Sequence, residues 1–232
     1  MPILLDIEGT TTPITFVYEV LFPYARQHLA DFLRAGWSEA EVQSCAQAFA
    51  EQVQVDGMGV AVQGNPAQQR QAVLANALTY MDADRKVTCL KTLQGLVWRD
   101  GYQRGELQGV VYEDVPAALH RWAGQARPAY IFSSGSVEAQ QLLMRHSTHG
   151  DLTSDLAGYF DTRIGSKREP DSYRRIAERM GAGPETITFA TDVLDEAEAA
   201  RQAGLQVVVM RRPGNPELPP HPFTEATDLL SL

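Results

Sequence analysis

The sequence predicts an α/β protein with a doubly wound parallel-sheet (Rossmann-like) core and an inserted all-helical domain. Three observations predict this class. One short apolar strand stands alone near the N-terminus, a stretch of about 85 residues then shows helical periodicity only, and strands alternate with helices from residue 101 onward. We therefore expect residues 1–13 and 101–232 to form the core, with residues 14–100 inserted as a helical cap.

The first strand is the apolar run Ile3–Leu5. It ends at residues 6–13, where acids, Gly, Thr and Pro replace the apolar side chains. A short apolar run followed by turn-forming residues is typical of a buried strand that leads into a loop.

The inserted domain is predicted from spacing. Apolar residues recur three and four positions apart in four stretches: Phe16–Leu33, Glu39–Val53, Pro66–Asp82 and Val87–Trp98. Pro66 stands in a first helical turn, where its missing N–H costs no hydrogen bond. We expect the larger aromatic side chains of this region to lie in the core: Phe16, Tyr18, Tyr24 and Trp98.

Strands and helices alternate in the remainder of the chain, with short links between them. The predicted strands are Ala129–Phe132, Tyr159–Ile164, Thr186–Ala190 and Gln206–Met210. The predicted helices are Asp114–Ala123, Val137–His146, Asp171–Met180 and Leu194–Ala203. Ser136 is a candidate N-cap, and Gly181 follows a predicted helix end. Alternation of this kind indicates a parallel sheet covered on both faces, and the five prolines of residues 211–222 indicate a surface loop.

The composition is that of an ordinary globular chain. Of 232 residues, 44% are hydrophobic and 21% charged, which excludes the disordered and membrane-spanning classes. The N-terminus lacks the basic and apolar pattern of a signal peptide, and no run of 18 apolar residues occurs, so we expect a cytoplasmic protein. Two cysteines, Cys45 and Cys89, are expected to be buried free thiols.

The net charge of −9 limits the partners. With 20 Lys and Arg against 29 Asp and Glu, the chain repels nucleic acid and anionic membranes. It also repels phosphorylated metabolites, so any phosphate chemistry needs a local cation, either a metal or a placed Lys or Arg. We expect a monomer with a small-molecule partner.

The chemistry is predicted where the strands end. In doubly wound sheets, ligands bind beyond the carboxyl ends of the strands. Polar residues at those positions are Asp6, Glu8, Ser133, Ser134, Lys167 and Asp192. The carboxylates form a hard oxygen set that suits Mg²⁺, while the two hydroxyls and the ammonium group suit a phosphate. A carboxylate beside a metal can attack phosphorus, and a second one can protonate the leaving oxygen.

Each feature also has an ordinary structural explanation. Asp6 and Glu8 resemble a solvated loop pair, and the serines from 133 to 136 resemble a helix-capping turn. Lys167 stands in a charged stretch of the kind that usually lies in solvent, and Asp192 suits an exposed loop. Their common position at one edge of one sheet favours a site.

The order of these motifs resembles the haloacid dehalogenase-like phosphohydrolases. The matching residues are Asp6-x-Glu8-Gly9-Thr10, then Ser133, then Lys167, then Thr191-Asp192 with Glu196. Glu8 stands where most family phosphatases have Asp. That Glu, together with residues 11–14, 131–140 and 165–167, resembles one branch, the enolase-phosphatases (acireductone synthases) of methionine salvage.

The resemblance implies catalytic and metal-binding roles for three residues. Asp6 would be the nucleophile and a ligand of a single Mg²⁺ ion. Glu8 would be the acid/base and would offer its main-chain carbonyl to the metal, and Asp192 would be the third ligand.

It also implies how the substrate is held. Ser133 and Ser134 would contact the phosphate, and Lys167 would orient it. Glu196 would lie behind them and hold Lys167 or a metal-bound water. The implied substrate is 2,3-diketo-5-methylthiopentyl-1-phosphate, which is first enolised and then dephosphorylated.

Two other functions stay open at this stage. One is a capped phosphatase of the same fold that acts on another small phosphate ester, and the other is a non-catalytic binding protein. The residue that removes the carbon-bound proton during enolisation, and the cap residues that hold the methylthio end, have no clear sequence signal.

Overall fold

The computed structural model describes all residues from 1 to 232. It divides into two compact units. The first comprises Met1–Tyr18 and Leu107–Leu232, and the second comprises Glu19–Glu106. Both boundaries lie a few residues beyond those predicted. At the second boundary, the last helix of the second unit continues to Gln103 rather than ending at Trp98.

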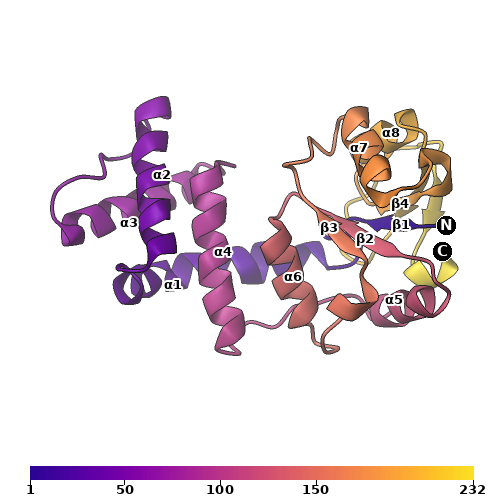
Figure 1. Cartoon of the computed structure of the whole chain (residues 1–232), viewed down its shortest axis with the longest axis horizontal. Helices are drawn as coiled ribbons and strands as arrows, with labels where there is room; N and C mark the ends of the chain where they lie inside the picture. Colours follow the sequence, from indigo (N-terminus) through magenta and orange to yellow (C-terminus); the bar gives the residue numbers. More distant parts are fainter. The chain divides into compact units, whose positions relative to one another are not determined.

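The first unit contains a parallel six-stranded sheet with the order β3-β2-β1-β4-β5-β6 (Figure 1). Its strands are β1 (Ile3–Leu5), β2 (Ala129–Phe132), β3 (Gly158–Phe160), β4 (Thr188–Thr191), β5 (Gln206–Met210) and β6 (Thr224–Ala226). The chain enters at the centre of the sheet and builds outward in both directions. The predicted doubly wound parallel sheet is therefore confirmed.

Helices cover both faces of this sheet. They are α5 (Val115–Gly124), α6 (Val137–Arg145), α7 (Pro170–Met180) and α8 (Leu194–Gln202). In Figure 1, α7 and α8 lie on one face, and α5 and α6 lie on the other. Leu4 of the central strand packs into a cluster with Tyr173 of α7 and Ala200 of α8. Because successive strand residues point to opposite faces, Ile3 and Leu5 are buried on the side away from that cluster.

The register aligns the ends of the three central strands. Leu5 is paired with Ile131 of β2 and with Ala190 of β4. The residues that follow each strand therefore leave the sheet at one level, on one edge. This alignment brings residues separated by more than 180 positions in sequence to the same place.

The second unit contains helices only. A π-helix over Phe16–Leu21 crosses the boundary and leads into α1 (Phe22–Ala35), α2 (Ala40–Asp56), α3 (Pro66–Asp82) and α4 (Thr88–Gln103). Asn65 and Gln68 form a reciprocal capping box that starts α3, with Pro66 at its first position. The core includes Phe49 and Tyr80, whose rings stack, and the buried free thiols of Cys45 and Cys89.

Two local predictions are wrong, and one strand was missed. The predicted strand Tyr159–Ile164 ends at Phe160, because the next residue, Asp161, accepts main-chain N–H groups from Val137 and Arg163 and turns the chain. The three-residue strand β6 was not predicted, because its Thr-Glu-Ala sequence has no apolar run. Tyr18 is 59% exposed rather than part of the core.

None of the helices combines the length and the apolar character needed to cross a bilayer.

Candidate active site

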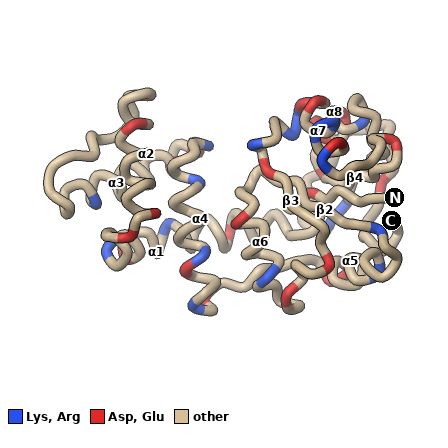
Figure 2. Tube along the Cα trace, viewed as in Figure 1, with Lys and Arg blue, Asp and Glu red and all other residues tan.

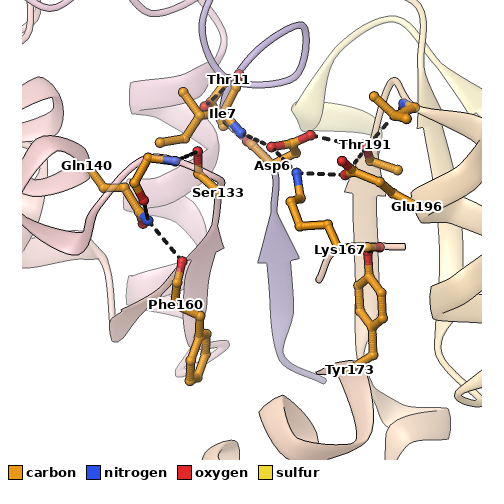
Figure 3. Close-up of polar contacts among 12 residues, drawn as sticks. Asp6, Ile7, Thr11, Ser133, Gln140, Phe160, Lys167, Tyr173, Thr191 and Glu196 are labelled. Atoms are coloured by element: carbon orange, nitrogen blue, oxygen red, sulfur yellow. Dashed lines mark hydrogen bonds and ion pairs between the residues drawn. The ribbon is translucent and has the colours of Figure 1, made fainter. Parts of the chain in front are cut away.

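Asp6 occupies the first position after the central strand β1 and is buried. Its Oδ1 atom accepts a hydrogen bond from its neighbour's main-chain N–H, that of Ile7, at 2.7 Å. The hydroxyl of Thr11 donates to the main-chain carbonyl of Asp6 at 3.2 Å. These contacts fix the carboxylate at the carboxyl edge of the sheet, where the sequence predicts it (Figure 3).

Lys167 reaches this carboxylate from the loop between β3 and α7. Its Nζ atom lies 2.6 Å from Asp6 Oδ1 and 2.6 Å from Glu196 Oε2. Its main-chain carbonyl accepts a hydrogen bond from the Tyr173 hydroxyl at 2.7 Å. Lys167 is only 8% exposed, so it does not belong to a solvated charged stretch.

Thr191, at the end of β4, joins the two carboxylates. Its Oγ1 atom lies 3.2 Å from Asp6 Oδ2 and 3.2 Å from Glu196 Oε2, and it accepts the main-chain N–H of Val193. A hydroxyl carries one proton, so Thr191 donates to one carboxylate at a time. The result is a closed cluster of two carboxylates, one ammonium group and one hydroxyl.

Acidic side chains outnumber basic ones at the carboxyl edge of the sheet, where Lys167 lies among Asp6, Glu8, Asp192 and Glu196. Elsewhere Lys and Arg are interspersed with Asp and Glu along both units (Figure 2). Burial, and after it the charge of Asp6, raise the pKa of Asp192 to about 7, while Lys167 acts in the opposite direction. Burial and Asp6 also raise the pKa of Glu196.

Lys167 itself holds its proton firmly. Burial alone would lower its pKa, but the charges of Asp6 and Glu196, and the hydrogen bonds to them, outweigh burial and raise it. The residue is therefore a fixed cation at neutral pH.

Asp192 lies against the turn that follows Glu8. Gly9 in that turn has a φ of 66°, and a Cβ atom at this position would overlap the Asp192 carboxylate. Glycine is therefore required both by the backbone conformation and by the close approach. Glu8 is half-buried, and its charge is among those that raise the pKa of Asp192.

Ser133 and Ser134 follow β2, the strand beside β1. Ser133 is buried, its N–H donates to the carbonyl of Phe160, and its Oγ accepts the N–H of Gly135 at 3.2 Å. The side-chain amide of Gln140 donates to the carbonyls of Gly135 and Phe160, at 2.8 and 2.9 Å (Figure 3). Ser134 is exposed. Gln140 thus fixes a loop that presents two serines at the same edge as Asp6.

The structure brings Asp6, Lys167 and Glu196 into direct contact. No group of three or more His, Cys, Asp or Glu side chains is arranged to hold a metal ion. The roles of Thr191 and Gln140 were not predicted. Both stand within motifs singled out in the sequence, but their importance depends on hydrogen bonds that no spacing rule reveals.

Comparisons with known proteins agree with this geometry. The family model of the haloacid dehalogenase-like hydrolases matches residues 3–204. The chain is 47% identical to "Enolase-phosphatase E1" of Danio rerio over 225 residues, which cover 93% of this chain and 86% of that protein. It is 48% identical over 240 residues to a protein of Physcomitrium patens, covering 99% of this chain and 47% of the other. That protein is named "Probable bifunctional methylthioribulose-1-phosphate dehydratase/enolase-phosphatase E1".

A solved structure is also similar over the whole chain. The crystal structure of the UTR4 protein of Saccharomyces cerevisiae superposes with a TM-score of 0.81 at 31% identity, covering 100% of this chain and 99% of that one. From the family match and these identities, the chain belongs to the haloacid dehalogenase-like hydrolases and, within them, to the enolase-phosphatase E1 family.

Proposed function

We propose that this protein is a Mg²⁺-dependent enolase-phosphatase of methionine salvage. It converts 2,3-diketo-5-methylthiopentyl-1-phosphate through an enol phosphate into the acireductone 1,2-dihydroxy-3-keto-5-methylthiopentene and phosphate. The observation that carries this proposal is the buried cluster of Asp6, Lys167 and Glu196 at the carboxyl edge of the sheet, in a chain 47% identical to an enolase-phosphatase.

Asp6 is the proposed nucleophile. A carboxylate oxygen of Asp6 attacks phosphorus, the bond from phosphorus to the substrate oxygen breaks, and an aspartyl-phosphate forms. Water then cleaves the aspartyl-phosphate and regenerates the carboxylate. Lys167 contacts Asp6 directly, so its fixed charge is available to orient the phosphate and to balance the charge that develops on its oxygens. Ser133 and Ser134 are the proposed phosphate contacts from the loop after β2.

The donor set fits Mg²⁺. The carboxylates of Asp6 and Asp192 and the main-chain carbonyl of Glu8 are all hard oxygen donors, and Mg²⁺ usually keeps several waters besides its protein ligands. This proposed site uses two carboxylates and one main-chain carbonyl as ligands. It therefore does not require a cluster of three acidic side chains. One Mg²⁺ ion per chain, when bound, would neutralise charge on the carboxylates and on the phosphate.

Glu8 is the proposed acid that protonates the departing oxygen. It is half-buried at the edge of the cluster and close enough to Asp192 for its charge to raise the pKa of that residue. Enolisation needs in addition a base that removes a proton from the carbon bearing the phosphate. Glu8 and a second group are the two candidates for that base, and the Glu8→Gln variant separates them.

The helical unit is the proposed cap, and its residues are proposed to recognise the methylthio end of the substrate. All proposed catalytic groups come from one chain, so we propose that the protein acts as a monomer. The name of the Physcomitrium protein is consistent with the substrate, because dehydration of a ketose phosphate such as methylthioribulose-1-phosphate gives a diketo phosphate.

A substrate profile tests the proposal. Purified protein with Mg²⁺ is assayed for phosphate release from the diketo phosphate and from a panel of sugar phosphates and other small phosphate esters. We expect kcat/KM for the diketo phosphate to exceed that of every simple ester by at least about 100-fold. Comparable values across the panel would instead indicate a phosphatase of broader or different specificity.

A further inference from the structure

The turn after Glu8 presents three main-chain carbonyls, and each accepts a hydrogen bond from another part of the first unit. Asn215 Nδ2 donates to the carbonyl of Gly9 at 2.9 Å. Arg212 Nε donates to the carbonyl of Thr10 at 2.9 Å. The N–H of Tyr112 donates to the carbonyl of Thr11 at 3.0 Å. The backbone of the nucleophile loop is thus held from outside at three successive residues.

Arg212 is itself firmly anchored. Its side chain is 2% exposed and forms two parallel bonds to the carboxylate of Asp114, with Nη–Oδ distances of 2.8 and 2.9 Å. It also donates to the carbonyl of Thr227 at 2.9 Å. Its guanidinium carbon lies 4.6 Å from the centre of the Tyr112 ring. A buried, bidentate and stacked arginine has one available position, so its bond to Thr10 has one available direction.

We propose that Arg212 and Asn215 are positioning residues that hold the Gly9–Thr10 backbone and so orient Glu8 for proton transfer. This inference rests on the proposed function, because the acid role of Glu8 is part of that proposal. Gly9 lies between Glu8 and the bond to Arg212, and it also lies against Asp192. A displaced Gly9 would therefore misdirect Glu8 and disturb Asp192 together.

Arg212 and Asn215 come from one segment that is distant in sequence from the turn they contact. Both lie in the proline-rich segment after β5, beyond residue 204, where the match to the general hydrolase family ends. Replacing a buried ion pair by apolar residues is often neutral or stabilising, so the pair of Arg212 and Asp114 is weakly explained by stability alone. The geometry of the Arg212–Asp114 pair is better explained by a role in fixing the Thr10 carbonyl of the catalytic turn.

The test compares Asn215→Ala and Arg212→Lys with Arg127→Lys. Arg127 is a matched control, because it also donates to main-chain carbonyls, those of Met1 and Leu232, and lies over an aromatic ring, but it does not contact the catalytic turn. Three quantities are measured for each variant: thermal stability, amide hydrogen exchange of residues 9–12, and kcat and KM for phosphate release. Substrates are the diketo phosphate and p-nitrophenyl phosphate, whose leaving group needs no proton.

We expect both test variants to exchange the amides of residues 9–12 faster than the parent and the control. We expect kcat on the diketo phosphate to fall by about 10- to 100-fold, with a smaller loss on p-nitrophenyl phosphate and with KM nearly unchanged. The control should lose thermal stability without these changes. If Arg212→Lys fails to fold, the test depends on Asn215→Ala. That variant removes hydrogen bonds but no buried ion pair, so it should fold.

Unchanged exchange in residues 9–12 with unchanged kcat, at a loss of stability equal to that of the control, would overturn the positioning role. Failure of the proposed function has a different signature: the parent would release phosphate from p-nitrophenyl phosphate and leave the diketo phosphate intact. In that case, exchange rates and the activity on p-nitrophenyl phosphate and on alkyl phosphates still decide whether Arg212 and Asn215 position the turn.

Discussion

Among single residues, Asp6 is the one on which the proposed phosphate release depends most. Asn has nearly the same size but lacks the nucleophilic charge and one anionic metal ligand. We expect Asp6→Asn to retain its fold and to lose phosphate release by about 1,000-fold or more. The measurement is phosphate release at saturating substrate, with a thermal melt to show that the variant is folded. Activity within about tenfold of the parent would remove Asp6 as the nucleophile.

Lys167 gives a second test at this scale. The sequence alone predicts that Lys167 lies on an open sheet edge, where its loss should hardly affect stability. Its burial between Asp6 and Glu196 changes this expectation. Lys167→Ala leaves two buried carboxylates facing each other, and breaking a buried pair of this kind costs about 3–5 kcal/mol.

We therefore expect Lys167→Ala to lose both thermal stability and turnover. Adding Glu196→Gln removes one of the two facing charges, so the double variant should regain stability without regaining turnover. Melting temperature and kcat are measured on the single and double variants. A double variant that stays as unstable as Lys167→Ala would show that charge repulsion is not the cause.

At the scale of elements, the turn after β1 carries the main prediction. Gly9 and Gly181 have nearly equal backbone angles, with φ of 66° and 64°, but only at Gly9 would a Cβ atom meet another group, the carboxylate of Asp192. Both Ala variants should lose about 1–2 kcal/mol because of the left-handed conformation. Gly9→Ala should in addition lose Mg²⁺-dependent activity, whereas Gly181→Ala should keep it.

Denaturant unfolding and Mg²⁺ titration of kcat measure the two effects separately. Equal activity of Gly9→Ala and Gly181→Ala would mean that the contact between the turn and Asp192 has no catalytic consequence.

The elements themselves were largely predictable from sequence. The strands Ala129–Phe132 and Gln206–Met210 and the helix Pro66–Asp82 have the predicted limits, because apolar periodicity and the residues at their ends agree. The prediction failed for β3, where the Asp161 carboxylate accepts the main-chain N–H of Arg163, which a longer strand would use, and also that of Val137 in α6. β6 failed because a short strand at the edge of the sheet needs no apolar run.

The candidate site was predictable in part, for a related reason. Strand ends and the family resemblance indicate Asp6, Lys167 and Asp192. By contrast, Arg212 and Asn215 act on main-chain carbonyls, which every residue possesses and which therefore leave no pattern in the sequence. Only the folded arrangement identifies them.

At the scale of the whole molecule, metal binding should be linked to stability and to pH. Without a bound cation, the Asp192 carboxyl has its pKa raised to about 7, mainly by burial, so it keeps its proton below that pH. A Mg²⁺ ion held by Asp192, as proposed, would have to displace this proton. The rise in melting temperature on adding Mg²⁺ should therefore be small at about pH 5.5, grow as the pH approaches 7, and level off by about pH 8.

Thermal melts with and without Mg²⁺ at several pH values measure this linkage, and Asp192→Asn is the control that should lose most of the increment. An increment that is constant from about pH 5.5 to about pH 8 would contradict a binding site that includes Asp192.

One site is proposed to carry out both enolisation and dephosphorylation. The most direct test follows ultraviolet absorbance and free phosphate together in one reaction of the diketo phosphate, for the parent and for Glu8→Gln, both with Mg²⁺. The parent should form the absorbing enol product and phosphate in equal amounts. Glu8→Gln should release almost no phosphate; it accumulates an absorbing enol phosphate if another group is the enolisation base, and neither signal if Glu8 is the base. Normal phosphate release by folded, Mg²⁺-loaded Glu8→Gln, or a parent that leaves the diketo phosphate unchanged, would contradict a single site for both half-reactions.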